Sequence, residues 1–213
     1  MKRALIAALA VAMMVLGAPA FAAHDDNPSD QVRTYRYDLG QVANNSDADG
    51  RTRLTALPNG KIQVKVYVED LAPNLPHAMH LHGILADGAF VAGACPTIAD
   101  DADGNGLVDT LEGVGDYGLV RVSLTTNGDT SPASALALDR FPVADADGVL
   151  EYSRTFTPDS DAVWAGLGAL EVVVHGVDLN GNGVYDFEAG PSSLTDAAPL
   201  EATLPAVCGG PGS

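Results

Sequence analysis

The sequence predicts an all-β domain: an antiparallel Greek-key β-sandwich or flattened barrel of about eight strands with two long loops. Three features of the residue pattern favour this fold. Short segments alternate apolar and polar side chains or are rich in β-branched residues, as half-buried strands are. Turn-forming residues separate these segments, and no segment repeats its apolar residues with the period of a long helix.

The predicted strands follow one another along the whole chain after its N-terminal part. They cover residues 32–37, 52–57, 61–69, 78–84, 118–125, 149–156, 171–175 and 202–204. Turns such as Pro58-Asn59-Gly60 and Asn127-Gly128-Asp129 separate them. The two long loops are residues 83–116 and 176–201. Because binding residues concentrate on loops held by a rigid scaffold, we expect function on these two loops and at the strand ends beside them.

The first 22 residues have the pattern of a secretory signal peptide. Lys2 and Arg3 precede an apolar run over residues 4–16, and Ala20-Phe21-Ala22 supplies the small-residue cleavage pattern. A membrane anchor is the alternative, but the run is short for a bilayer span and is broken at Gly17 and Pro19. We therefore expect an exported protein, periplasmic or extracellular and not membrane-bound after cleavage. A flexible segment over residues 23–31 is followed by a single domain over residues 32–213.

The chain is strongly acidic. It has 11 Lys and Arg residues against 28 Asp and Glu residues, a formal net charge of −17. Loss of Lys2 and Arg3 with the signal peptide makes this charge more negative still. Nucleic acid and anionic membranes are therefore excluded as expected partners. The acidic residues gather in stretches rich in Gly and Asn, which indicates bound cations.

Cys95 and Cys208 are the only two cysteines. In an oxidising compartment a disulfide between them is the default expectation. A pair of zinc-binding thiolates is the alternative, but two cysteines alone do not complete a tetrahedral zinc site.

Three of the five histidines lie between residues 77 and 82. On a strand, residues two apart share a face, so His80 and His82 are expected side by side, with His77 directed elsewhere. His175 ends the apolar run Val172-Val173-Val174 and can supply a third imidazole from a neighbouring strand. Three imidazoles without a thiolate suit copper or zinc. Ordinary half-buried strand histidines are the alternative interpretation.

Taken together, the histidine and cysteine motifs resemble those of copper/zinc superoxide dismutases. The resemblance covers residues 54–209 and is carried, in order, by residues 77–83, Cys95, Gly115-Asp116-Tyr117-Gly118, Val173-Val174-His175 and Cys208-Gly209. It implies that His80, His82 and His175 bind one copper ion and that His77 is a structural histidine. It also implies an intrasubunit disulfide between Cys95 and Cys208, and copper or superoxide as the small ligand.

The chain departs from that family at two places. No histidine lies between His82 and His175, where the family has its copper–zinc bridge and two more zinc ligands, so we expect no zinc. Asp116 occupies the position of a zinc-ligating aspartate, but one carboxylate without imidazole partners makes no zinc site. Pro205 stands where the family has an arginine that guides superoxide to copper. The chain therefore lacks the guiding charge that the family has at this position.

A calcium-loop pattern replaces the expected zinc loop. Residues 101–112 match the twelve-position loop of EF-hands, with Gly106 at the sharp turn. The predicted calcium ligands are Asp101, Asp103, Asn105, the Leu107 carbonyl, Asp109 and Glu112. An acidic turn without an ion is the alternative. Flanking helices are not evident in the sequence, so we expect an EF-hand-like loop without a full helix-loop-helix.

A second, weaker copy of this pattern starts at Asp178. Its predicted ligands are Asp178, Asn180, Asn182, the Val184 carbonyl, Asp186 and Glu188. Position 12 is Ala189, so Glu188 or a distant carboxylate has to close the site. The two long loops are thus predicted to be metal-binding loops in which calcium cancels charge and stabilises the fold.

Three functions are compatible with these features. The first is a copper-dependent superoxide dismutase without zinc, an oxidoreductase stabilised by one or two calcium ions. The second is a non-catalytic protein that sequesters or delivers copper. The third is a calcium-stabilised structural module with vestigial histidines.

Overall fold

The structure is a computed structural model and describes residues 31–44 and 46–213. The predicted signal peptide and nearly all of the segment at residues 23–31 lie outside the described residues. Within the part that is described, no helix has the length and apolar character needed to cross a membrane.

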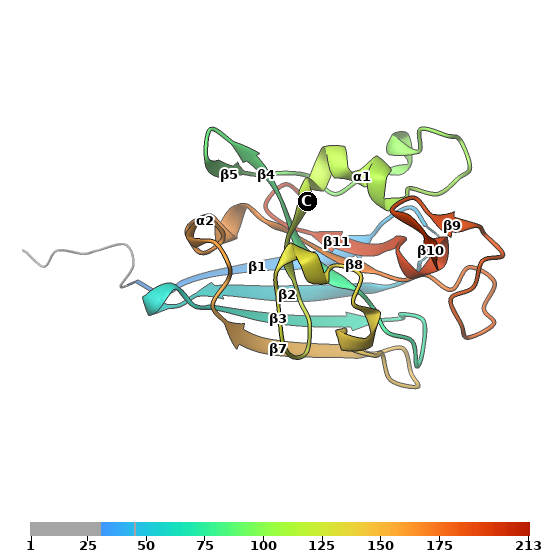
Figure 1. The fold of residues 1–213 in the computed structure, drawn as a ribbon, viewed down its shortest axis with the longest axis horizontal. Coiled ribbons are helices and arrows are strands. Elements are labelled where there is room, and N and C mark those ends of the chain that lie inside the picture. The colour runs from blue at the N-terminus through green and yellow to red at the C-terminus, as the bar shows by residue number, and fades with distance from the viewer. Residues whose placement is uncertain (1–30, 45) are drawn as a thin grey trace, which may run out of the picture.

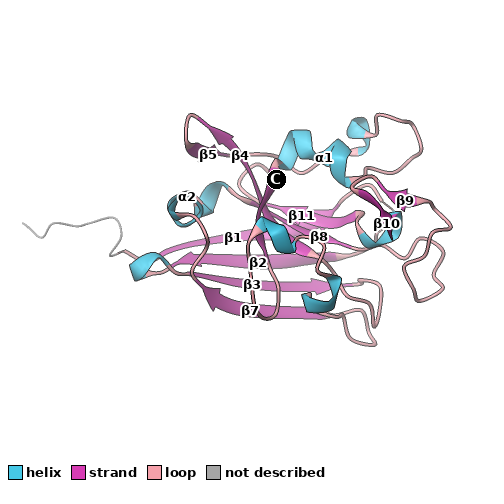
Figure 2. Ribbon diagram, in the orientation of Figure 1, coloured by secondary structure: helices cyan, strands magenta, loops and turns pink. Residues whose placement is uncertain are grey.

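Strands dominate the structure, and the helices are short (Figure 2). The strands are β1 (Arg33–Gln41), β2 (Asp49–Ala56), β3 (Ile62–Glu69), β4 (Met79–Ala86), β5 (Ala89–Val91), β6 (Leu119–Ser123), β7 (Leu150–Phe156), β8 (Glu171–His175), β9 (Pro191–Ser192), β10 (Thr195–Pro199) and β11 (Pro205–Gly209). The α-helices are α1 (Thr110–Tyr117) and α2 (Asp161–Ala165). Short 3₁₀ turns cover Pro58–Gly60, Ile98–Asp100, Pro132–Ser134, Leu138–Arg140, Leu167–Ala169 and Leu200–Ala202.

Nine of the described strands form one antiparallel sheet that curls around the core. Its order is β5-β4-β8-β11-β1-β2-β3-β7, with β6 paired to β4 in addition, while β9 and β10 pair separately. Figure 1 shows β1, β2, β3 and β7 side by side, with β4 crossing near β8 and β11. This arrangement confirms the all-β antiparallel sandwich or flattened barrel predicted from the sequence.

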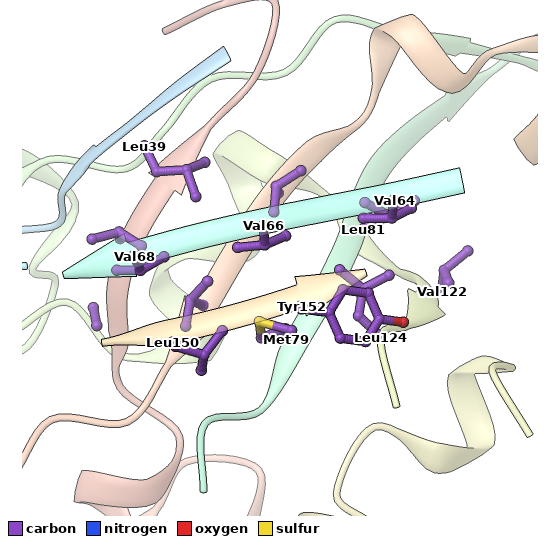
Figure 3. Packing of buried hydrophobic residues seen from close by; sticks show 14 of the residues in the cluster. Leu39, Val64, Val66, Val68, Met79, Leu81, Val122, Leu124, Leu150 and Tyr152 are labelled. Atoms are coloured by element: carbon purple, nitrogen blue, oxygen red, sulfur yellow. The ribbon is translucent and has the colours of Figure 1, made fainter. Parts of the chain in front are cut away.

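The core lies on the inner face of the curled sheet (Figure 3). On β3, Val64, Val66 and Val68 are buried, whereas Lys65 is exposed, as the alternation of the sequence predicts. The valines pack in the same cluster as Met79 and Leu81 of β4. Burying a side chain of this size contributes about 1.5–3 kcal/mol. The core face of β4 is therefore fixed, and its opposite face is available for other side chains.

Seven of the eight predicted strands are confirmed, with ends shifted by a few residues. The strand predicted at residues 202–204 is wrong. Leu200–Ala202 forms a 3₁₀ turn, and the strand begins only at Pro205. Proline is tolerated as the first residue of a strand, so Pro205 can begin β11.

In Figure 1 the segment before α1 in the first loop and the segment after β8 in the second both lie at the right-hand end of the molecule. The first loop runs from β5 into α1, and the second runs from β8 to the β9–β10 hairpin. Both therefore lie on connections that adjoin the strands carrying the histidines.

Candidate metal centre

Strand β4 places His80 and His82 on one face. Met79 and Leu81, which alternate with them, are fully buried in the core. Strand β4 is paired on one side with β8, where His80 lies opposite Val173, and on the other with β6. The two imidazole centroids lie 5.5 Å apart. The side-by-side arrangement predicted from the His-x-His spacing is therefore present.

His175 comes to the same place from the end of β8. Its backbone N–H donates to the Ala78 carbonyl at 2.8 Å, which anchors it at the start of β4. Its ring centroid lies 5.1 Å from that of His80 and 5.8 Å from that of His82. One ring nitrogen of each of the three histidines lies within 4.8 Å of the others. The predicted trio is thus brought together by two neighbouring strands.

Backbone carbonyls orient each of the three rings. His80 Nε2 donates to Ala135 O at 3.0 Å, His82 Nδ1 to Gly118 O at 2.9 Å, and His175 Nδ1 to Thr203 O at 2.8 Å. Each bond fixes the tautomer, because the nitrogen that faces a carbonyl has to carry the proton. The other nitrogens, His80 Nδ1, His82 Nε2 and His175 Nε2, then present a lone pair.

These three nitrogens are buried and have no hydrogen-bond partner among the described residues. The side chains of His80, His82 and His175 are only 4%, 1% and 3% exposed. An unsatisfied buried acceptor costs about 1–3 kcal/mol, so three converging ones call for a ligand. A metal ion held by three imidazole nitrogens satisfies all three at once, and such a donor set suits copper or zinc.

The electrostatics of the pocket keep the imidazoles neutral. Burial lowers the pKa of His82 to about 3 and that of His175 to about 4. The pKa of His80 also lies well below its ordinary value, first because of burial and then because of its histidine neighbours. A metal-binding imidazole has to be neutral, so the trio is in the binding-competent form at pH 7.

His77 points away from this pocket, as the sequence predicts. Its ring nitrogens lie 2.9 Å from the His175 carbonyl and 3.0 Å from the Ala72 carbonyl, and the Tyr185 hydroxyl is 3.3 Å from Nδ1. The residue is fully buried, and burial lowers its pKa. His77 thereby ties the segment before β4 to the end of β8, behind the third histidine of the trio.

Asp116 and Pro205 occupy positions that carry a zinc ligand and a guiding arginine in the dismutase pattern. Asp116 lies on α1, and burial followed by the charge of Asp100 raises the pKa of its carboxyl. It belongs to none of the groups of three or more His, Cys, Asp or Glu residues that converge within the described residues. Pro205 pairs with His175 in the β8–β11 ladder, so it lies next to the histidine trio and brings no charge there.

The first acidic loop has its carboxylates gathered around one point. The carboxylate oxygens of Asp101, Asp103 and Glu112 approach within 4.8 Å of one another. Asp101 accepts the backbone N–H groups of loop positions 4, 5 and 6, which are Gly104, Asn105 and Gly106. Gly104 and Gly106 have φ values of 74° and 85°, so glycine is favoured at both turns.

A helix overlaps the last three positions of this loop. Helix α1 begins at Thr110, position 10, and Asp109 caps it by accepting the N–H groups of Leu111 and Glu112. The sequence concealed the helix because its eight residues include two glycines and carry no long apolar period. The loop therefore has a helix on its C-terminal side.

The second acidic loop repeats this backbone pattern. Asp178 accepts the N–H groups of Gly181, Asn182 and Gly183, again positions 4, 5 and 6. Asp186 accepts bonds from the side chains of Asn180 and Asn182, and Glu188 from that of Asn180. The side chains of Asn180, Asn182, Asp186 and Glu188 are therefore close together, whereas in the described residues the carboxylates of this loop form no converging group of three like that of the first loop.

Glu201 closes the second loop and was missed from the sequence. Glu112 accepts the N–H of Ala102 (position 2) and of Asp109 (position 9), each at 2.8 Å. Glu201 accepts the N–H of Leu179 at 2.9 Å and of Asp186 at 2.8 Å, the same two positions of the second loop. Its side chain is 1% exposed. Glu201 is therefore the candidate for the distant carboxylate left open by the sequence, identified by these two hydrogen bonds and by its burial.

Cys95 and Cys208 form a disulfide, as predicted, with their Cα atoms 5.7 Å apart. Beside it lies Glu171, the first residue of β8, which is fully buried. Neither carboxylate oxygen has a hydrogen-bond partner of good geometry in the described part of the chain. Burial raises the pKa of Glu171 to about 7, and the nearby Gly93 backbone offsets this only in part.

A small cavity adjoins the histidine trio. Its volume is about 30 Å³, and no charged side chain is among the described residues that line it. Apart from the histidines, the wall consists of Ala78, Thr110, Val120, Ala135, Leu136, Leu194 and Thr203. The fold and this site together define an antiparallel β-sandwich protein with a buried three-histidine pocket.

The chain matches no protein-family model and no curated protein. A solved crystal structure, that of the clock protein EA4, is similar at 16% sequence identity and a TM-score of 0.36. The alignment covers 81% of this chain and 91% of that chain. A similarity at this level decides nothing about the function of the chain.

Proposed function

We propose that this chain is an exported copper-binding protein related to the superoxide dismutases, in which His80, His82 and His175 hold one copper ion. The single observation that carries the proposal is the convergence of three buried, unpartnered imidazole nitrogens. Metal-binding histidines commonly donate their second ring N–H to a backbone carbonyl, as these three histidines do. Copper bound there supplies a one-electron couple between Cu(I) and Cu(II).

Export is supported by two features. The first 22 residues have a signal-peptide pattern. The disulfide between Cys95 and Cys208 is of the kind that persists in oxidising compartments. A periplasmic or extracellular protein is therefore proposed.

Calcium binding at the two acidic loops is part of the same proposal. The first loop has the full twelve-position pattern, and the second has it once Glu201 is counted as the closing residue. Each ion would offset part of the carboxylate repulsion and stabilise loops that adjoin the histidine strands. The histidine pocket favours the copper-binding hypotheses over a purely structural calcium module, because such a module has no need of three converging imidazoles.

Dismutation of superoxide is the activity that the resemblance implies. In that reaction one superoxide is oxidised to dioxygen and a second is reduced, with two protons, to hydrogen peroxide. The alternative, copper holding without turnover, is favoured by one observation: no charged side chain lines the cavity beside the histidines. Loss of favourable steering lowers association rates by about 10- to 1,000-fold.

A metal inventory with an activity assay tests the proposal. We expect the purified protein to contain one copper per chain and, in calcium-containing buffer, bound calcium. A superoxide assay with and without a calcium chelator then separates a dismutase from a holding protein. Purified protein that neither contains copper nor takes it up would contradict the proposal.

A further inference from the structure

The wall of the histidine cavity offers few additional ligands. In the described part of the chain, its only other side-chain polar groups are the hydroxyls of Thr110 and Thr203. The Thr110 hydroxyl donates to Thr203 O at 2.6 Å, and the Thr203 hydroxyl contacts Ser192 Oγ at 2.8 Å. Both hydroxyls are thus engaged within the protein. An ion in the pocket is left with three neutral nitrogens and a space of about 30 Å³, enough for about one water.

The mouth of the cavity is apolar. Among the lining residues only Leu136 and Leu194 are strongly exposed, at 43% and 42%. Leu136 follows Ala135, whose carbonyl binds His80, and Leu194 lies in the turn between β9 and β10. Single exposed leucines are ordinary, but here two from separate segments border the same buried polar pocket. The histidines behind them are at most 4% exposed, so the solvent-exposed part of the cavity wall is apolar.

Such a pocket discriminates between ions by charge. The desolvation cost of an ion grows with the square of its charge, so burying a divalent ion costs about four times as much as burying a monovalent one. Here no carboxylate or other anion in the wall compensates that cost. Cu(II) also favours tetragonal coordination with nitrogen and oxygen ligands, whereas three nitrogens alone suffice for Cu(I).

We infer that the apolar mouth formed by Leu136 and Leu194 makes the three-histidine pocket selective for Cu(I) over Cu(II). The inference rests on the proposed function, since it assumes that the trio binds copper. In this interpretation Leu136 and Leu194 determine the selectivity. They exclude the water molecules and anions that Cu(II) requires as additional ligands.

The test compares dissociation constants for Cu(I) and Cu(II), each measured by competition with a chelator of known affinity. The proteins are the wild type, the double variant Leu136→Ser/Leu194→Ser, and the control Leu85→Ser. Leu85 is 49% exposed and is not among the lining residues, so it reports the general effect of removing a surface leucine. We expect the wild type to bind Cu(I) at least tenfold more tightly than Cu(II).

In the double variant the ratio should fall by tenfold or more, mainly through tighter Cu(II) binding, and the control should keep the wild-type ratio. A tenfold change corresponds to 59 mV in the reduction potential of a one-electron couple, which gives an independent readout. An unchanged ratio in the double variant, or a wild type that prefers Cu(II), would overturn the inference.

Failure of the proposed function has a different signature. In that case the wild type would bind neither oxidation state stoichiometrically. Thermal melts of all three proteins show whether a variant is misfolded. The double variant Leu136→Ala/Leu194→Ala opens the mouth without adding hydroxyls, so it shows whether a changed ratio comes from the opening itself. A pair of alanine substitutions that also lowers the ratio supports the inference, and one that leaves it unchanged contradicts it.

Discussion

Glu201 holds the second acidic loop at the same two backbone positions at which Glu112 holds the first. In both loops one carboxylate oxygen accepts the N–H of position 2 and the other accepts that of position 9. Glu112 belongs to its own loop, whereas Glu201 comes from the 3₁₀ turn before β11. The carboxylate that closes the second loop is therefore supplied by the tertiary fold.

This equivalence predicts the effect of two substitutions. Glu201→Gln should abolish calcium binding at the second loop, as Glu112→Gln should at the first, because each removes the closing carboxylate. At calcium concentrations of 100 times the dissociation constant, one site adds about 2.7 kcal/mol to the free energy of unfolding. Each variant should lose about that increment, measured as the difference between melts in calcium and in chelator.

Glu188→Gln is the matched control, because Glu188 was the other candidate for closing the second loop. It should keep both calcium-dependent increments. If Glu188→Gln loses the second site while Glu201→Gln binds calcium like the wild type, the assignment of Glu201 is wrong.

The disulfide should contribute strongly to stability. It closes a loop of 113 residues, for which the chain-entropy model gives about 4–5 kcal/mol. The double variant Cys95→Ser/Cys208→Ser should lose an amount of this order in denaturant unfolding. Alkylation of the unreduced, denatured wild type should modify no cysteine, and modification at two sites would contradict the pairing.

Glu171 should make stability depend on pH. Its pKa is about 7 in the folded protein against an ordinary value of 4.5, so the folded state binds the proton more tightly than the unfolded state. Stability should therefore fall as the pH rises from 4.5 through 7, by about 3 kcal/mol in total. Below pH 4.5 the carboxyl is protonated in both the folded and the unfolded state, so it adds no further dependence of stability on pH.

Glu171→Gln removes this dependence, because the amide stays neutral. The difference in unfolding free energy between the variant and the wild type, measured at pH 5 and pH 8, isolates Glu171 from the histidines. The variant should gain relative to the wild type at pH 8. Equal differences at the two pH values would show that the carboxyl is not perturbed by burial.

Local patterns predicted most of the fold and part of the site. Strand alternation placed His80 and His82 on one face, and the apolar run before His175 placed the third histidine at a strand end. Helix α1 was not predicted, because its glycines give the segment a weak helix propensity. The helix begins there because Asp109 caps its first turn.

The remaining site residues could not be predicted, because only the tertiary fold brings them together. Glu201 lies 22 residues from the backbone group it binds in Leu179. Leu136 and Leu194 come from separate segments, and neither shows any sequence signal that separates it from an ordinary surface leucine. Such residues follow no spacing rule in the sequence, so they can be identified as site residues only from the folded structure.

The copper content of the triple variant His80→Ala/His82→Ala/His175→Ala tests the central claim most directly. After loading with copper and removal of excess metal, the wild type should retain one copper per chain and the triple variant none. His24→Ala, which removes the histidine nearest the predicted N-terminus of the exported chain, should retain one and serves as the control. Stoichiometric copper retained by a folded triple variant would show that the metal binds elsewhere and would contradict the account.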